Sequence, residues 1–143
     1  DFYEPFTVHE SSLSPCVHSI QAAKLDRMQQ AYQFYLRTSR LDLDDYNKEV
    51  EEGLHITSMA GTWMSIVEGF GGMRIRNDKL SFRPRIPDEW ESYSFKINFR
   101  NRILKVLIDK SGAHFELEGD HEMSIRLNGE RVVLKPVSKA AAK

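Results

Sequence analysis

The spacing of apolar residues divides this sequence into two parts that meet near Gly72. In the first part, apolar residues such as Val17, Ile20, Met28 and Ala31 recur at intervals close to the helical period. This spacing predicts one helix over residues 15–38. Ser14 is the expected N-cap, because Pro15 suits the first position of a helix.

A second helix is predicted over residues 56–68, where Ile56, Met59, Trp63 and Val67 share one face. Residues 40–53 are acidic and irregular, which indicates a loop with a short helical turn. The glycines of "GFGG" (69–72) are expected to end the second helix. Two helices and a loop bury little surface, so they should pack against another part of a protein.

After Gly72 the apolar period changes to two, which is typical of strands. Phe95, Ile97 and Phe99 alternate with polar residues and should face inward. Asn101, "KSGA", "EGDH" and Asn128-Gly129 mark turns, the last being a strong two-residue hairpin signal. The sequence therefore predicts an α+β chain, with helices in residues 1–72 and a small antiparallel β-sandwich in residues 73–143.

Composition narrows the class of protein. The 143 residues are 41% hydrophobic, which is typical of globular chains, and 20 Lys and Arg nearly balance 21 Asp and Glu. This balance gives no reason to expect nucleic acid or an anionic membrane as a partner. No apolar run could span a bilayer, and no signal peptide precedes the first helix. With a single cysteine, Cys16, the chain is expected to be cytoplasmic.

Two stretches place polar side chains just before a predicted helix: "HESSLSP" (9–15) and "HITS" (55–58). A helix N-terminus exposes unpaired N–H groups and a partial positive charge, so it favours anions. If the two starts converge, Ser11, Ser12 and His55 would form an anion pocket. The alternative is that these residues only cap their helices. The histidines show no metal-ligand spacing, so no metal site is predicted.

Four stretches resemble glycoside hydrolase family 65 and cover nearly the whole chain. They are "FYEPFTVHESSLSPCVHSI" (2–20), "YLRTSRLDLDDYN" (35–47), "EEGLHITSMAGTWMSIVEGFGGMR" (51–74) and "LSFRPRIPDEWESYSFKINFRNRILKV" (80–106). The resemblance implies that residues 1–72 are the last helices of an (α/α)6 barrel catalytic domain. It also implies that residues 73–143 are the C-terminal β-domain.

The resemblance further implies an inverting disaccharide phosphorylase, with maltose and inorganic phosphate as substrates and β-glucose 1-phosphate and glucose as products. No metal or organic cofactor is implied, because phosphate is a co-substrate. Ser11, Ser12 and His55 would bind the phosphate. The general acid is a glutamate upstream of this chain, so no catalytic residue is expected here. The expected partners are an α-linked glucose disaccharide, the remainder of the catalytic domain, and a second copy of the complete enzyme.

Two alternatives stay open at the level of sequence. The chain could be a non-catalytic fragment whose β-domain serves structure or interaction. A hydrolase of the same family would need a carboxylate base near the phosphate position, and Glu10 is the one candidate in the first motif.

Overall fold

A computed structural model describes residues 6–7, 11–45, 48, 51 and 53–137. Its elements form two compact units, Asp1–Gly69 and Phe70–Lys143. The first unit is helical and the second consists of strands, so the chain has the mixed helical and sheet composition predicted from its sequence.

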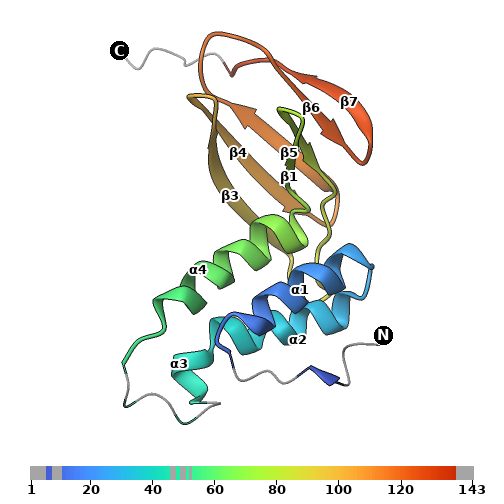
Figure 1. Cartoon of the computed structure of the whole chain (residues 1–143). Coiled ribbons are helices and arrows are strands. Elements are labelled where there is room, and N and C mark those ends of the chain that lie inside the picture. Colours follow the sequence, from blue (N-terminus) through green and yellow to red (C-terminus); the bar gives the residue numbers. More distant parts are fainter. Residues whose placement is uncertain (1–5, 8–10, 46–47, 49–50, 52, 138–143) are drawn as a thin grey trace. The chain divides into compact units, whose positions relative to one another are not determined.

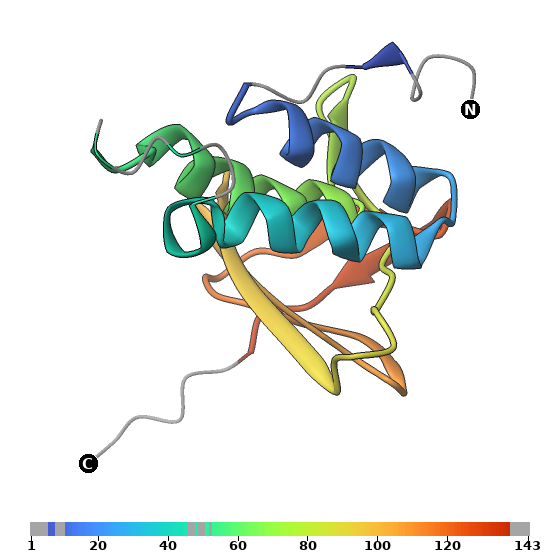
Figure 2. The ribbon, with the colours of Figure 1, turned by 90° about the horizontal axis from the view of Figure 1, so that it is seen from below.

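In the described residues of the helical unit there are four α-helices, followed by a short π-helix that ends at Phe70, the first residue of the second unit (Figure 1). Helices α1, α2 and α4 lie side by side in this unit, as Figure 2 also shows. The bounds are α1 (Ser14–Lys24), α2 (Met28–Ser39), α3 (Leu41–Asp44), α4 (Ile56–Met64) and the π-helix η3 (Ser65–Phe70).

The prediction of one helix over residues 15–38 is wrong. The chain turns between α1 and α2, where Asp26 adopts a left-handed backbone with φ of 60°. Aspartate tolerates this conformation better than most residues. The backbone N–H of Asp26 donates to the carbonyl of Ala23, and that of Arg27 donates to the carbonyl of Ala22. These hydrogen bonds satisfy carbonyl groups at the C-terminus of α1. Because no glycine or proline is involved, the sequence lacks the usual signal that a helix ends here.

The predicted N-cap of α1 is also wrong by one residue. Ser14 is the first residue of the helix, and Leu13 occupies the cap position without a side-chain hydrogen bond. The hydroxyl of Ser11 instead accepts from the N–H of Leu13 at 3.3 Å, and the Ser11 carbonyl accepts from the N–H of Ser14 at 3.0 Å. Ser11 therefore supports the turn that leads into the helix.

The three long helices approach closely because small residues lie between them. Ser19 on α1 donates to the carbonyl of Ala31 on α2 at 2.9 Å, and Ser58 on α4 donates to the carbonyl of Thr38 at 2.6 Å. Both hydroxyls are buried, so these bonds satisfy groups that could not reach water. They fix the positions of α1, α2 and α4 within the helical unit.

The second unit contains two sheets. One has the order β1-β2-β6-β7 and the other the order β3-β4-β5. Their strands are β1 (Arg74–Arg76), β2 (Lys79–Phe82), β3 (Ser92–Phe99), β4 (Arg102–Asp109), β5 (Gly112–Leu117), β6 (Met123–Leu127) and β7 (Glu130–Leu134). All pairs are antiparallel except β2 with β6, which is parallel. The prediction of a small antiparallel β-domain is therefore confirmed for most strand pairs, and the parallel pair joins strands far apart in sequence.

The alternating pattern correctly predicted the inner face of the three-stranded sheet. Phe95 is buried, Ile97 and Phe99 are half-buried, and the residues between them are exposed. The ring of Phe82, from the other sheet, lies 6.4 Å from the ring of Phe95 and 5.3 Å from that of Phe115. The two sheets thus share one aromatic core between their inner faces.

Candidate phosphate site

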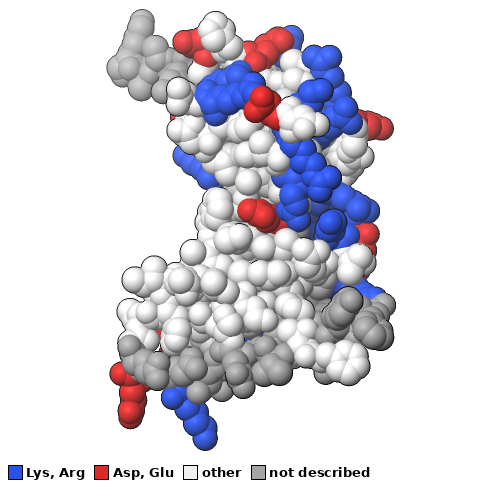
Figure 3. All heavy atoms as spheres, in the orientation of Figure 1, with Lys and Arg blue, Asp and Glu red and all other residues white. Residues whose placement is uncertain are grey.

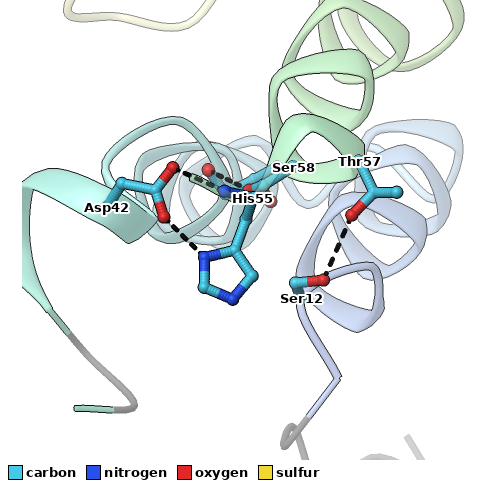
Figure 4. A network of polar contacts seen from close by, with 6 residues as sticks. Ser12, Asp42, His55, Thr57 and Ser58 are labelled. Carbon is cyan, nitrogen blue, oxygen red and sulfur yellow. Dashed lines mark hydrogen bonds and ion pairs between the residues drawn. The ribbon is translucent and has the colours of Figure 1, made fainter. Parts of the chain in front are cut away.

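A pair of hydroxyl groups joins the two polar helix starts that the sequence singled out. The Oγ atom of Ser12, in the turn before α1, lies 3.4 Å from the Oγ1 atom of Thr57, the second residue of α4 (Figure 4). The two starts are 45 residues apart in the chain. The folded helical unit therefore brings the N-termini of α1 and α4 together, with hydroxyl groups at their meeting point.

His55 immediately precedes α4, and a carboxylate on α3 holds its ring. The Nδ1 atom lies 2.6 Å from Oδ1 of Asp42, and the backbone N–H of His55 donates to Oδ2 of Asp42 at 3.0 Å (Figure 4). One residue thus engages both carboxylate oxygens. Because an ionised carboxylate only accepts hydrogen bonds, the Nδ1 atom carries a proton in this contact. This fixes both the orientation of the ring and which nitrogen is protonated.

The contact is partly shielded from solvent and changes the acidity of Asp42. The side chains of His55 and Asp42 are 20% and 17% exposed. The pKa of Asp42 is lowered, chiefly by the hydrogen bond from the His55 ring and further by the bond from its backbone N–H. The carboxylate therefore stays charged in neutral solution.

The side chain of His55 does not cap α4. His55 stands at the cap position, but its ring makes no cap hydrogen bond. Its carbonyl instead accepts from the N–H groups of Ser58 and Met59. The ring is turned to Asp42, so its contact there serves a purpose other than capping.

The structure places the three predicted phosphate ligands as follows. Ser12 contacts Thr57 at the start of α4. His55 lies two residues before Thr57 in the chain. Ser11 is exposed, and its hydroxyl interacts with Leu13. Close approach of all three side chains to one anion stays a prediction. Two further members of the first motif, His9 and Glu10, lie outside the described residues.

Sequence reasoning missed Asp42. It lies in an acidic stretch with Asp44 and Asp45, and nothing local separates the three. Asp44 forms an ion pair at 2.7 Å with Arg40, the residue just before α3, whereas Asp42 contacts His55, which is 13 residues away in the chain. A spacing of 13 residues between an aspartate and a histidine is not a recognised pattern, so only the tertiary structure shows the pair.

Other candidate chemistry is limited. Burial, and more weakly the nearby charge of Glu68, raises the pKa of the Cys16 thiol, which opposes a reactive thiolate. Among the described residues, no three His, Cys, Asp or Glu side chains gather closely enough to hold a metal ion. In that same part of the chain, no helix combines the length and apolar character needed to cross a bilayer.

Comparison with known proteins places the chain in a family. Residues 1–64 match the model of the glycosyl hydrolase family 65 central catalytic domain, and residues 73–134 match that of the family's C-terminal domain. The chain belongs to glycosyl hydrolase family 65. The two matches meet close to the division between the helical and strand units.

Similar proteins in this family are phosphorylases by name. Over 94% of its length, the chain is 54% identical to a maltose phosphorylase of Bacillus subtilis and 42% identical to an alpha,alpha-trehalose phosphorylase of Thermoanaerobacter brockii. It is 31% identical to a kojibiose phosphorylase of Escherichia coli over 93% of its length. These matches cover 17 to 18% of the relatives' own lengths. A solved structure called a putative kojibiose phosphorylase from human microbiome matches 94% of this chain and 18% of its own, with a TM-score of 0.89 and 44% identity.

Proposed function

We propose that this chain is the C-terminal part of an inverting disaccharide phosphorylase and supplies its phosphate pocket. The complete enzyme would cleave maltose with inorganic phosphate, giving β-glucose 1-phosphate and glucose. Membership of family 65 and the phosphorylase names of similar proteins support this proposal. Ser11, Ser12 and His55 would hold the phosphate.

One observation carries the assignment of the pocket: two helix starts meet at Ser12 and Thr57, beside a histidine held by Asp42. Each helix N-terminus offers N–H groups that lack partners within the helix and a partial positive charge. Serine and threonine hydroxyls can donate further hydrogen bonds to an oxyanion. A protonated His55 would add a charged donor, and charge-assisted bonds are the stronger kind.

In the proposed reaction the pocket binds and orients phosphate, which is the nucleophile, and does not have to activate it. Phosphate is already an anion, so it needs no general base to attack the anomeric carbon. The pocket must fix the phosphate on the face of the sugar opposite the leaving group, which explains inversion. Asp42 would contribute indirectly. Its carboxylate accepts from the backbone N–H and the ring Nδ1 of His55, and these two contacts fix the orientation of the ring.

The preference for maltose rests on sequence similarity. The 54% identity to a maltose phosphorylase exceeds the 42% and 31% found with a trehalose and a kojibiose phosphorylase. The general acid, the sugar-binding residues and the remaining helices of an (α/α)6 barrel would come from the rest of the catalytic domain. We further propose that the complete enzyme is a homodimer.

The test replaces His55 by alanine in the complete enzyme. A charge-assisted hydrogen bond is worth about 1.5–3 kcal/mol, so kcat/KM for phosphate should fall by roughly 10- to 150-fold. Ser12→Ala should have a smaller effect, because neighbouring N–H donors remain. Initial rates are measured against phosphate at saturating maltose. Unchanged kcat and KM for phosphate in the His55→Ala enzyme would overturn the ligand assignment.

A matched histidine controls for effects of folding. His18 on α1 is half-buried and packs against the ring of Phe34, with 5.3 Å between ring centroids. His18→Ala should lower the melting temperature and leave the phosphate dependence unchanged. Rates with maltose, trehalose and kojibiose at equal phosphate then test the sugar preference. Sugar release without phosphate would identify a hydrolase instead.

A further inference from the structure

The outer face of the four-stranded sheet in the second unit carries a concentration of positive charge. Arg76 on β1 pairs with Lys79 on β2, and Arg126 on β6 pairs with Arg131 on β7. Arg74 lies two residues from Arg76 and therefore points to the same face. Among the described residues at outward positions of this sheet there is no carboxylate.

Like charges directly opposite each other on neighbouring strands destabilise a sheet. On the three-stranded sheet a similar pair is compensated. Lys96 pairs with Lys105, but Glu116 lies 3.2 Å from Lys105 and Glu118 lies 3.9 Å from Lys96. Among the described residues, no carboxylate of the four-stranded sheet plays this part for the pairs Arg76–Lys79 and Arg126–Arg131, although the chain as a whole has a net charge of −1. Sheet stability therefore does not explain its arginines.

A hollow of about 520 Å³ adjoins this charged face. The tips of the β1–β2 and β3–β4 hairpins border it, and β6 and β7 contribute the rest of its wall. In Figure 3 the blue atoms of Lys and Arg gather over this part of the second unit. Five cations and one carboxylate line the hollow, namely Lys79, Arg100, Arg102, Arg126, Arg131 and Asp78.

Three of these arginines are oriented by contacts within the unit. Arg100 lies 3.4 Å from Asp78, and Arg102 donates to the carbonyl of Glu122 at 2.7 Å. The Nε atom of Arg131 donates to the hydroxyl of Ser124 at 3.0 Å. Each contact uses part of a guanidinium group, which has five N–H donors. The remaining donors keep a defined direction, which lowers the entropy lost when a ligand binds.

We propose that this hollow binds a small molecule carrying two or more phosphate groups. Its volume lies within the range of small-molecule sites. Arginine matches phosphate with paired hydrogen bonds, and cations from four strands and a hairpin tip surround more space than one phosphate fills. Sites for single-stranded nucleic acid stack bases on exposed aromatic rings. The one aromatic residue of this lining, Phe99, has the Arg100 guanidinium over its ring at 5.4 Å from the centroid.

The site lies in the strand unit and does not depend on the phosphate pocket proposed for the helical unit. Inorganic tripolyphosphate is the probe, and its binding to the complete enzyme is measured by isothermal titration calorimetry at an ionic strength of about 0.15 M. Arg126→Gln combined with Arg131→Gln should weaken binding about tenfold per arginine, hence roughly 100-fold. Lys96→Gln combined with Lys105→Gln makes the same change in net charge on the same unit. This control should alter affinity by no more than about twofold, because exposed distant charges are screened.

The His55→Ala enzyme separates this site from the active site. Tripolyphosphate binding should persist in that variant, and phosphorolysis should persist in the arginine double variant, which shows that the latter is folded. Binding lost in His55→Ala but retained in the arginine variant would overturn the inference. Equal losses in the arginine and lysine variants, with duplex DNA binding more tightly than tripolyphosphate, would also overturn it in favour of a nonspecific polyanion surface. The phosphate groups of the ligand could belong to a nucleotide or to a sugar. Titrations with a nucleoside diphosphate and with a sugar bisphosphate then show which of the two binds more tightly.

Discussion

At the scale of single residues, the contact between Asp42 and His55 determines what the proposed pocket can do. The ring of His55 has one nitrogen directed at a carboxylate, so its orientation and tautomer depend on a residue that need not touch the substrate. We regard Asp42 as a positioning residue. Removing the carboxylate partner of a metal-bound histidine typically lowers affinity or activity by 10- to 100-fold, and we expect an effect of the same order for a phosphate-binding histidine.

We therefore expect Asp42→Asn to lower kcat/KM for phosphate in the complete enzyme by about 10- to 100-fold. The amide cannot accept both hydrogen bonds from His55 and brings no negative charge. The loss should be much smaller in an enzyme that already carries His55→Ala, because the two residues act as a unit. Fully additive effects in this double-mutant cycle would show that Asp42 acts independently of the ring.

The same contact predicts a dependence of stability on pH. Since the pKa of Asp42 is lowered in the folded state, its contribution to stability is present above the ordinary pKa of aspartate, about 4. That contribution is lost as the pH falls through the lowered value. The difference in unfolding free energy between wild type and Asp42→Asn should therefore shrink in acid. Denaturant titrations at neutral and acidic pH measure this difference.

At the scale of elements, the approach of α4 to α1 and α2 depends on Gly61. A Cβ atom at this position would lie 2.9 Å from Cβ of Cys16 and 3.3 Å from Cγ2 of Thr38. Both neighbours are buried, so neither can move away freely. The small residue lets three helices pack at this crossing.

Gly61→Ala should lower stability, although alanine favours helices by about 1 kcal/mol over glycine. Overpacking costs typically 1–3 kcal/mol, so we expect a net loss of about 1–2 kcal/mol. Gly69→Ala is the matched control, since a Cβ atom there meets its nearest neighbour at 3.6 Å, an ordinary contact. Unfolding midpoints of the two variants are compared. An equal or higher midpoint for Gly61→Ala would contradict the close packing.

At the scale of the whole chain, the two units differ in how much apolar surface they expose. Of the large hydrophobic residues that are exposed in the described part of the chain, three belong to the strand unit and the others to the helical unit. The helical ones are Phe6, Leu13, Val17, Leu25, Leu43, Leu54, Ile56, Met59 and Trp63. Under the proposed function, the rest of the catalytic domain would cover this surface.

The chain produced by itself should consequently self-associate, because exposed apolar patches of this kind promote association. Light scattering should give a mass above that of a monomer. The double variant Met59→Ser with Trp63→Ser should reduce the association, since both side chains are about half exposed on α4. A stable monomer of the unmodified chain across a range of concentrations would contradict this expectation.

The sequence by itself determined features that depend on neighbouring residues. Alternation placed Phe95 on an inner face because side chains of a strand point alternately to opposite sides. Asn128-Gly129 formed the predicted turn, with both residues at positive φ, a conformation that this pair adopts at little cost. The polar starts of two helices were likewise visible locally, and the family resemblance then suggested their role.

Tertiary structure alone decided the features that join distant segments. The break at Asp26 gave no glycine or proline signal, because hydrogen bonds to preceding carbonyls stabilise the turn. The parallel pairing of β2 with β6 brings together strands separated by more than 40 residues, so no local pattern records it. Asp42 differs from Asp44 only in what lies opposite it once His55 has come to lie beside α3. The free energy of such contacts depends on distances in space between residues far apart in the chain, and the spacing of residues in the sequence does not give those distances.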